Sequence, residues 1–186
     1  EGLGLGTRFA DWFEGNDQAN FLVGDRGDTL IGNGGDDIFL LSAAPASLSG
    51  GDGNDTIVEF TDTTWVADGN GDGLADLVFA DHGVSVDMGS AGNKIIDDGF
   101  GGSGTFSGIE NVGGGFYDDT IIGDGNNNVL TGYEGNDHLD GGAGIDTVNY
   151  EENIPLVGFV SSRTEGVSVN LAAGVGGTIT GGETDT

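Results

Sequence analysis

The chain has 186 residues, of which 40 are glycine, 32 are acidic and only four (Arg8, Arg26, Lys94 and Arg163) are basic. The formal net charge of −28 excludes nucleic acid as a partner, because no basic surface can be built to neutralise phosphates. The absence of cysteine excludes disulfides and thiolate metal sites, and no apolar run reaches the length of a membrane-spanning helix.

The charge also bears on folding, since it opposes a compact state unless something positive is bound. One interpretation is therefore an acidic disordered segment, and this is the better one when no cation is present. Against it, 35% of the residues are hydrophobic, including 10 phenylalanines, and they recur at regular positions. Regular apolar positions favour a folded chain that depends on a bound cation.

The chain contains a repeat with a period of nine residues. The clearest units are GGDGNDTIV at 50–58, GYEGNDHLD at 132–140 and GGAGIDTVN at 141–149. In the same register, the first block has units that begin at Gly6, Gly15, Gly24, Gly32, Leu41 and Gly50. The second block has units that begin at Thr105, Gly114, Gly123, Gly132 and Gly141. The unit at 24–31 is one residue short.

Two positions of the unit are nearly invariant in character. The eighth position is always apolar, with Phe13, Leu22, Leu30, Phe39, Leu48, Ile57, Val112, Ile121, Leu130, Leu139 and Val148. The residue two places earlier, which we call the turn column, almost always carries a side-chain oxygen. Its members are Asp11, Asn20, Asp28, Asp37, Ala46, Asp55, Glu110, Asp119, Asn128, Asp137 and Asp146.

These positions predict an all-β fold, a parallel β-roll. A segment such as GGDGN turns tightly because glycine reaches positive φ freely, and the three residues after it form a short strand with a central apolar residue pointing inward. Two units make one coil, so units n and n+2 stack. A single unit cannot bury its apolar residue, so an array is required.

The order along the chain predicts four segments. Residues 1–58 are expected to form a first β-roll block, 59–104 an irregular β-rich insertion, and 105–150 a second block. Residues 151–186 are expected to form a partial further repeat of a longer protein. In it, the alternating valines of 166–171 are expected to form a strand without a proper neighbour.

The units resemble the repeat G-G-x-G-x-D-x-U-x of the RTX family, in which U is a large apolar residue, and which is a calcium-binding parallel β-helix signature. The resemblance covers residues 6–58 and 105–149. Segments GVSVDM (83–88), GVSVNL (166–171) and FSGIENVGG (106–114) also look like connectors common in secreted RTX-array proteins. The resemblance implies type I secretion from a Gram-negative bacterium and folding outside the cell, where calcium is abundant.

The residue chemistry independently fits calcium, which prefers six to eight oxygen ligands. Stacking units two apart pairs Asp37 with Asp55 and Asp119 with Asp137. Weaker pairs are Asn128 with Asp146, Asp11 with Asp28, Asn20 with Asp37, and Glu110 with Asn128, while Ala46 leaves the Asp28 site incomplete. The alternative is that these side chains only solvate the corners of turns.

A second type of calcium site is predicted in the insertion, where DGNGDGLAD at 68–76 places oxygens at Asp68, Asn70, Asp72 and Asp76. It resembles the start of a D-x-[DN]-x-D-G loop but lacks the EF-hand glutamate, because the twelfth position is Phe79. The alternative is an acidic hairpin tip. In total we expect roughly five to eight bound calcium ions of six to eight ligands each.

No enzyme is predicted. The two histidines, His82 and His138, are not in a metal-ligand spacing, and neither HExxH nor GxSxG occurs. We therefore expect a calcium-binding module that serves secretion, folding and rigidity of a larger secreted protein, with which it is covalently continuous. Alternatives are a structural segment of a cell-surface adhesin or S-layer-like protein, or an accessory module, with a carbohydrate partner, of a secreted polysaccharide-active enzyme.

Overall fold

The computed structural model describes residues 3–5, 9–43, 45, 47–59, 63–66, 76–79, 82–89, 94–99, 101–149, 167–170 and 178–180. Within these ranges the chain forms strands and turns. None of the described residues belongs to a helix long and apolar enough to cross a membrane.

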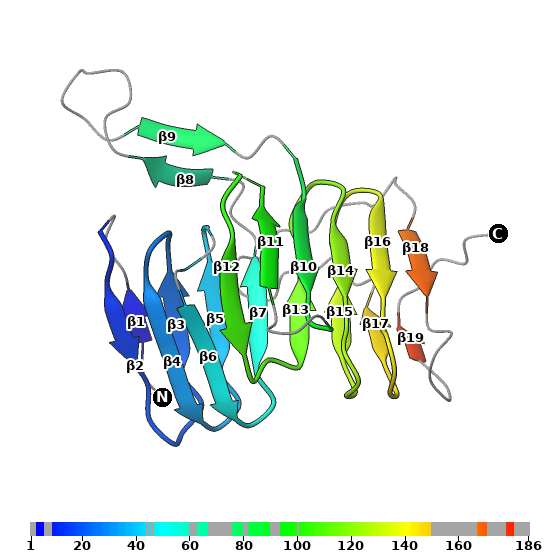
Figure 1. The fold of residues 1–186 in the computed structure, drawn as a ribbon, viewed down its shortest axis with the longest axis horizontal. Coiled ribbons are helices and arrows are strands. Elements are labelled where there is room, and N and C mark those ends of the chain that lie inside the picture. Colours follow the sequence, from blue (N-terminus) through cyan, green and yellow to red (C-terminus); the bar gives the residue numbers. More distant parts are fainter. Residues whose placement is uncertain are drawn as a thin grey trace.

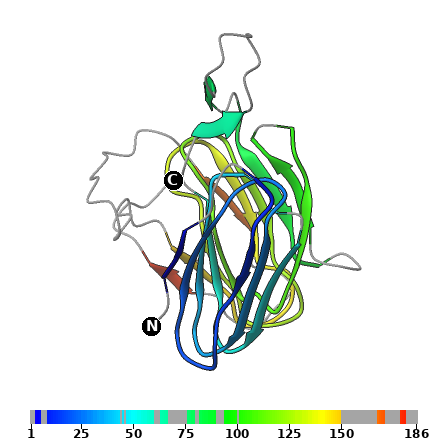
Figure 2. The same cartoon turned by 90° about the vertical axis from the view of Figure 1, so that its left-hand side faces the viewer.

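Two sheets face each other across a narrow interior, as Figures 1 and 2 show. The first, in spatial order, contains β1 (Leu3–Leu5), β3 (Phe21–Gly24), β5 (Ile38–Leu41), β7 (Thr56–Glu59), β13 (Asn111–Gly113), β15 (Val129–Thr131), β17 (Thr147–Asn149) and β19 (Thr178–Thr180). The second contains β18 (Val167–Asn170), β16 (Asp137–Asp140), β14 (Thr120–Ile122), β10 (Val84–Asp87), β11 (Lys94–Asp98), β12 (Gly104–Ser107), β6 (Ser47–Asp52), β4 (Thr29–Gly34) and β2 (Trp12–Glu14).

Successive units alternate between the two sheets, so neighbouring strands of one sheet come from units two apart and run parallel. In the first sheet Ile38 lies opposite Thr56, and Val129 lies opposite Thr147, each at the same position of its unit. Two units therefore make one coil. The prediction of an all-β parallel β-roll is confirmed.

The short unit at 24–31 changes this spacing without changing the strands. Trp12 lies opposite Thr29 and Phe21 lies opposite Ile38, so the partners are one residue closer along the chain than in the regular coils. The missing residue belongs to the turn, which Gly27 closes with a φ of 91° and an Asp28 N–H donated to the Asp25 carbonyl at 3.2 Å. Because the turn is the part that is one residue shorter, the strands on either side of it keep the same side chains pointing inward.

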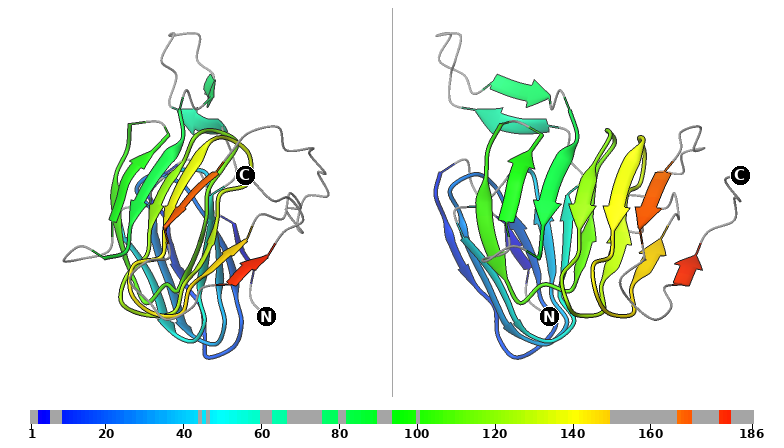
Figure 3. Two further views of the ribbon diagram at one scale, coloured as in Figure 1. Left: turned by 90° about the vertical axis from the view of Figure 1, so that its right-hand side faces the viewer. Right: turned by 45° about the vertical axis from the view of Figure 1, so that its right-hand side comes forward.

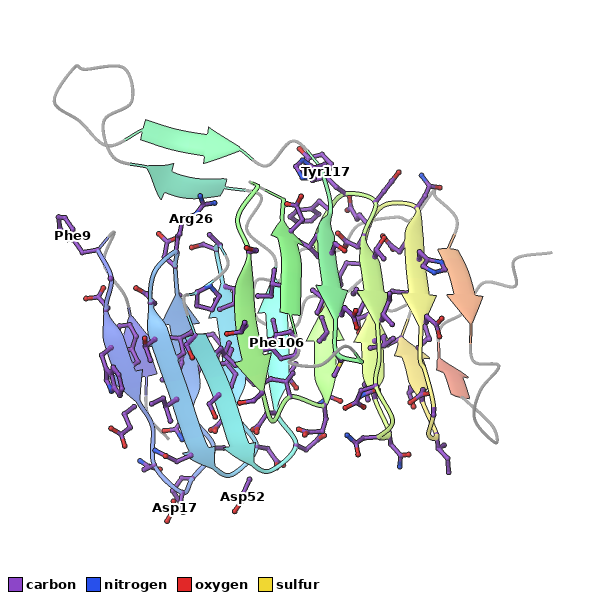
Figure 4. The ribbon with its side chains drawn as sticks, viewed as in Figure 1. Phe9, Asp17, Arg26, Asp52, Phe106 and Tyr117 are labelled. Atoms are coloured by element: carbon purple, nitrogen blue, oxygen red, sulfur yellow. The ribbon has the colours of Figure 1, made fainter. Side chains whose placement is uncertain are left out.

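The interior is filled by the apolar eighth position of the units. Strands alternate buried and less buried residues because successive side chains point to opposite faces of a sheet. Ten of the eleven predicted side chains are buried, and Phe13, on the terminal strand β2, is partly buried against them. Phe106 of β12 joins the same core (Figure 4).

The turns lie along two opposite edges of the roll. Figure 4 places Asp17 and Asp52 at one edge, and Arg26 and Tyr117 at the other. Each coil therefore contributes one turn to each edge, and the turn column is divided into two rows.

The insertion interrupts one sheet only. In the first sheet β7 pairs directly with β13, so the two repeat blocks form one continuous roll. In the second sheet β12 pairs with β6, and the antiparallel pair β10–β11 lies between β12 and β14. Strands β8 (Thr63–Val66) and β9 (Asp76–Phe79) form a separate antiparallel hairpin (Figure 3).

One expectation from the sequence was wrong. Strand β18 is formed by the alternating valines that were expected to have no proper neighbour, and it pairs in parallel with β16, with Val167 opposite Asp137. The reason is that β16 has a free edge on the side away from β14, and a strand of suitable alternation can extend the second sheet there.

Candidate metal centres in the turns

The turn-column side chains are buried at the corners of the roll. The members that are at most 5% exposed are Asn20, Asp28, Asp37, Asp55, Asp119, Asn128, Asp137 and Asp146. Asp11 and Glu110 are partly exposed. Carboxylates are almost never fully buried unless they are paired. Their partners therefore decide what the turns can bind.

In most column carboxylates, one oxygen accepts a backbone N–H from the neighbouring coil. Asp37 donates its N–H to Oδ1 of Asp55 at 2.8 Å, and Asp119 donates its N–H to Oδ1 of Asp137 at 3.1 Å. The same bond joins Asp11 to Asp28, Asn20 to Asp37 and Asn128 to Asp146. Every predicted pair, Glu110 and Asn128 included, lies where two adjacent strands begin.

In five of the turns the second oxygen, Oδ2 of Asp37, Asp55, Asp119, Asp137 or Asp146, faces the glycine that begins the unit. A Cβ built on Gly32 would lie under 3.0 Å from both Asp37 Oδ2 and the Gly50 carbonyl oxygen, nearer than Cβ atoms come. A Cβ on Gly50 would meet Asp55 Oδ2 and the Gly108 carbonyl oxygen in the same way. Glycine is required there because these oxygens converge on the space that a side chain would occupy.

Asp37 and Asp55 differ from the other column carboxylates. Their Oδ2 atoms are, among the described side chains, the two buried polar atoms without a hydrogen-bond partner. In contrast, Asp28 Oδ2 accepts from the Asp25 N–H at 2.8 Å, and Asp119 Oδ2 accepts from the Gly115 N–H at 2.7 Å. A buried acceptor without a partner costs about 1–3 kcal/mol, more when it is charged, and a cation bound at these two positions would offset that cost.

The pKa values of two column carboxylates also favour a bound cation. Burial, together with the charges of Asp37, Glu110 and Asp36, raises the pKa of Asp55 to about 6, although the Asp37 N–H opposes the shift. Burial also raises the pKa of Asp28. A divalent cation reverses this effect, because its charge favours the ionised carboxylate.

Comparison with known families explains the pattern. A family model described as the RTX calcium-binding nonapeptide repeat matches the chain in four copies, at residues 5–28, 27–43, 47–58 and 113–148. The chain carries RTX repeats. No curated protein matches it.

The composition of the turns suits the calcium chemistry of RTX repeats. Within the described part of the chain, no three acidic or histidine side chains gather where they could hold a metal ion. Backbone carbonyls such as those of Gly50 and Gly108 must therefore complete any site. Calcium accepts such ligands, since it binds carboxylate and carbonyl oxygens at about 2.3–2.6 Å.

Two predicted features lie outside the described residues. Asp68, Asn70 and Asp72 of the insertion loop are not among them, and Asp76 is described only as the first residue of the β9 backbone. Ala46 is likewise outside. The predicted loop site therefore stays a prediction.

A second ladder of hydrogen bonds was missed in the sequence. In three pairs of stacked turns it joins the residues that precede the turn-column members, and it runs in the opposite direction. Asn54 donates its N–H to Asp36 Oδ1 at 3.0 Å, and Asn136 donates its N–H to Asp118 Oδ1 at 2.8 Å. The available signal was the doublet DD, ND or NN that ends five of the turns, at 36–37, 54–55, 118–119, 127–128 and 136–137.

A pair of neighbouring substitutions tests the turn column. Asp137→Ala removes the acceptor for the Asp119 N–H, an acceptor that is 2% exposed, and we expect a cost of about 1–3 kcal/mol in calcium. His138→Ala changes an exposed side chain and should cost within about 0.5 kcal/mol. Calcium titrations of both variants, followed by circular dichroism in matched salt, compare them. A larger effect of His138→Ala would contradict the assigned register.

Proposed function

We propose that this chain is a calcium-loaded RTX module that folds when it binds extracellular calcium. The observation that carries the proposal is the pair of buried Oδ2 atoms of Asp37 and Asp55, which have no partner and face backbone carbonyls. RTX nonapeptide repeats bind calcium. The proposal assigns that calcium to the two rows of turns.

The proposed protein ligands are the side-chain oxygens of the turn column, together with those of the insertion loop. They are Asp11, Asn20, Asp28, Asp37, Asp55, Asp68, Asn70, Asp72, Asp76, Glu110, Asp119, Asn128, Asp137 and Asp146. The described column members are supported by their burial and by their stacking in consecutive coils.

We also propose that the module is secreted and serves a larger protein by folding and becoming rigid only outside the cell. RTX repeats are typical of secreted bacterial proteins. The net charge of −28 supports folding outside rather than inside the cell. Self-repulsion keeps the calcium-free chain unfolded until bound calcium neutralises part of that charge. A non-catalytic role is supported by carboxylates such as Asp55 and Asp137, in each of which Oδ1 accepts a backbone N–H of the roll.

The test is to count and locate the ions. Calorimetric titration of the whole chain with calcium should give roughly five to eight ions, and magnesium should not replace them, because it demands tighter octahedral geometry. Anomalous diffraction should place ions between the Asp37 and Asp55 turns and between the Asp119 and Asp137 turns. A folded chain that binds no calcium at either place would overturn the proposal.

A further inference from the structure

One edge of the roll carries exposed aromatic side chains in a turn of the second block. Phe116 and Tyr117, 37% and 38% exposed, are consecutive residues of the turn between β13 and β14. Figure 4 places Tyr117 at this edge. Tyr117 is the fourth residue of its unit, the position that Gly53 and Gly135 occupy in theirs. An exposed ring therefore stands where the turn needs no side chain.

The turn at 132–136 lies directly beside this one in the following coil. Glu134 donates its N–H to the Gly115 carbonyl at 3.2 Å, and a Cβ on Gly135 would lie under 3.0 Å from the Tyr117 carbonyl oxygen. Because Gly135 has no side chain, nothing from that position covers the Tyr117 ring. The following coil therefore leaves Tyr117 open and adds the partly exposed carboxylate of Glu134 to the same edge.

His82 lies on the other side of Tyr117, at the start of the strand β10. Ser85 is opposite Thr120 in the second sheet, so His82 and Tyr117 each stand three residues before this matched pair. The His82 side chain is 48% exposed, and its Nε2 lies 3.0 Å from Asp97 Oδ2, which fixes the imidazole. Neighbouring strands of a sheet are about 4.8 Å apart, so two ring side chains belong to adjacent coils of one edge.

Tyr133 shows that a ring is kept at this edge in spite of backbone strain. Its φ is 65°, in a place of the unit where Gly51 and Gly142 have φ values of 112° and 78°. A bulky L residue adopts this conformation only at a steric cost. The ring packs on Val58, and a Cβ on Gly113 would lie 2.8 Å from its Cε2. Tyr133 thus braces the turn beside Tyr117 against the outer face of the first sheet.

The chemistry of this edge limits what it can bind. The net charge of −28 repels anionic ligands. A stable protein partner would need about 800 Å² of surface and roughly 20–30 residues, whereas the edge is a narrow row of turns (Figure 2). An uncharged hexose polymer fits better. Its apolar C–H faces stack on aromatic rings, and its hydroxyl groups exchange hydrogen bonds with carboxylate and imidazole groups.

We propose that the edge formed by His82, Phe116, Tyr117 and Glu134 binds an uncharged polysaccharide, whose sugar rings stack on the aromatic side chains. The polymer runs along the edge from coil to coil, because the rings stand on neighbouring turns. The site rests on the proposed function in that these turns stack only in the folded, calcium-loaded chain. None of the four side chains except that of Glu134 lies in a matched repeat without its ring or imidazole being dispensable for the turn column, so loss of polysaccharide binding leaves calcium binding intact.

The test is affinity electrophoresis of the whole chain, in calcium, through gels that contain β-glucan, galactomannan or starch, with the anionic polymer alginate in a separate gel. We expect at least one neutral polymer to retard the chain, and alginate not to. Tyr117→Ala and Phe116→Ala should weaken the binding about tenfold or more, as loss of a central aromatic contact does. Tyr117→Phe should keep the binding, whereas Tyr117→Leu should lose it, because stacking needs a ring.

Trp12→Ala is the matched control, since this ring is 67% exposed on β2, the terminal strand of the second sheet. It should leave the binding unchanged. The calcium midpoint by circular dichroism should be the same in all the variants, because exposed substitutions have small effects on stability. A shifted midpoint would assign Tyr117 a structural role instead.

Three results would overturn the site while leaving the proposed function intact. They are no retardation by any of the three neutral polymers, equal retardation by alginate, and equal loss of binding in Trp12→Ala. Sedimentation equilibrium gives an independent answer. A dimer of the wild type that dissociates in Tyr117→Ala would assign the edge to a second copy of the chain. A wild type that neither folds with calcium nor binds it would overturn both proposals.

Discussion

In EDTA the chain will be largely unfolded, and millimolar calcium will restore the β signal in circular dichroism. The reason is that folding buries column carboxylates such as Asp37 and Asp55, both 0% exposed, in a chain with a net charge of −28. Binding of calcium to the folded state alone becomes folding free energy. This is the largest effect that the structure predicts, because it decides whether the roll exists.

Two controls separate metal binding from charge screening. Sodium chloride at matched ionic strength screens exposed charges, with a Debye length of about 8 Å at 0.15 M. It does not supply a cation that the oxygens inside the turns can coordinate. Magnesium supplies the charge with the wrong geometry. We expect both to leave most of the chain unfolded. A chain that is fully folded and equally stable in EDTA would show that the unpartnered oxygens are tolerated without metal.

The second large effect is expected from Gly50→Ala. The added Cβ would lie under 3.0 Å from the Gly108 carbonyl oxygen and from Asp55 Oδ2. The carbonyl belongs to the backbone and cannot rotate away, and the methyl group would occupy the space on which both oxygens converge. We expect a cost above the usual range of about 0.5–3 kcal/mol for single substitutions, and a large upward shift of the calcium midpoint.

Gly125→Ala is the matched control, since a Cβ there would meet nothing within 4 Å and its φ is outside the left-handed region. Such a change can even stabilise by about 0.4–1 kcal/mol through the unfolded state. The measurement is a calcium titration of each variant by circular dichroism. If Gly50→Ala folds with the wild-type midpoint, the turn has room that the structure does not show.

The period of nine made most of the roll predictable. It predicted which side chains point inward, for example those of Phe39 and Leu130. An apolar residue at the same position of every unit lies on the same face of its strand, and that face is the buried one. It also gave the stacking of Asp37 on Asp55, because units two apart return to the same edge.

Contacts that involve the insertion, which lacks the nine-residue period, could not be predicted from the sequence. Glu110 was placed in the turn column, but its contact with Asp55 bridges the insertion and depends on how the chain returns from it. The same is true of Val84, whose N–H is bonded to Asp119 Oδ1 at 2.8 Å. The unpartnered Oδ2 atoms of Asp37 and Asp55 were also out of reach, because they depend on side-chain rotation within a turn.

The short turn at 24–28 shows how such an array can change in length. Removing one residue from a turn left the paired strands with the same faces inward, as the match of Trp12 with Thr29 shows. Removing one residue from a strand would instead rotate every later side chain of that strand to the opposite face. Insertions and deletions should therefore accumulate in turns, or come as whole coils of two units, since that is the step between stacked strands.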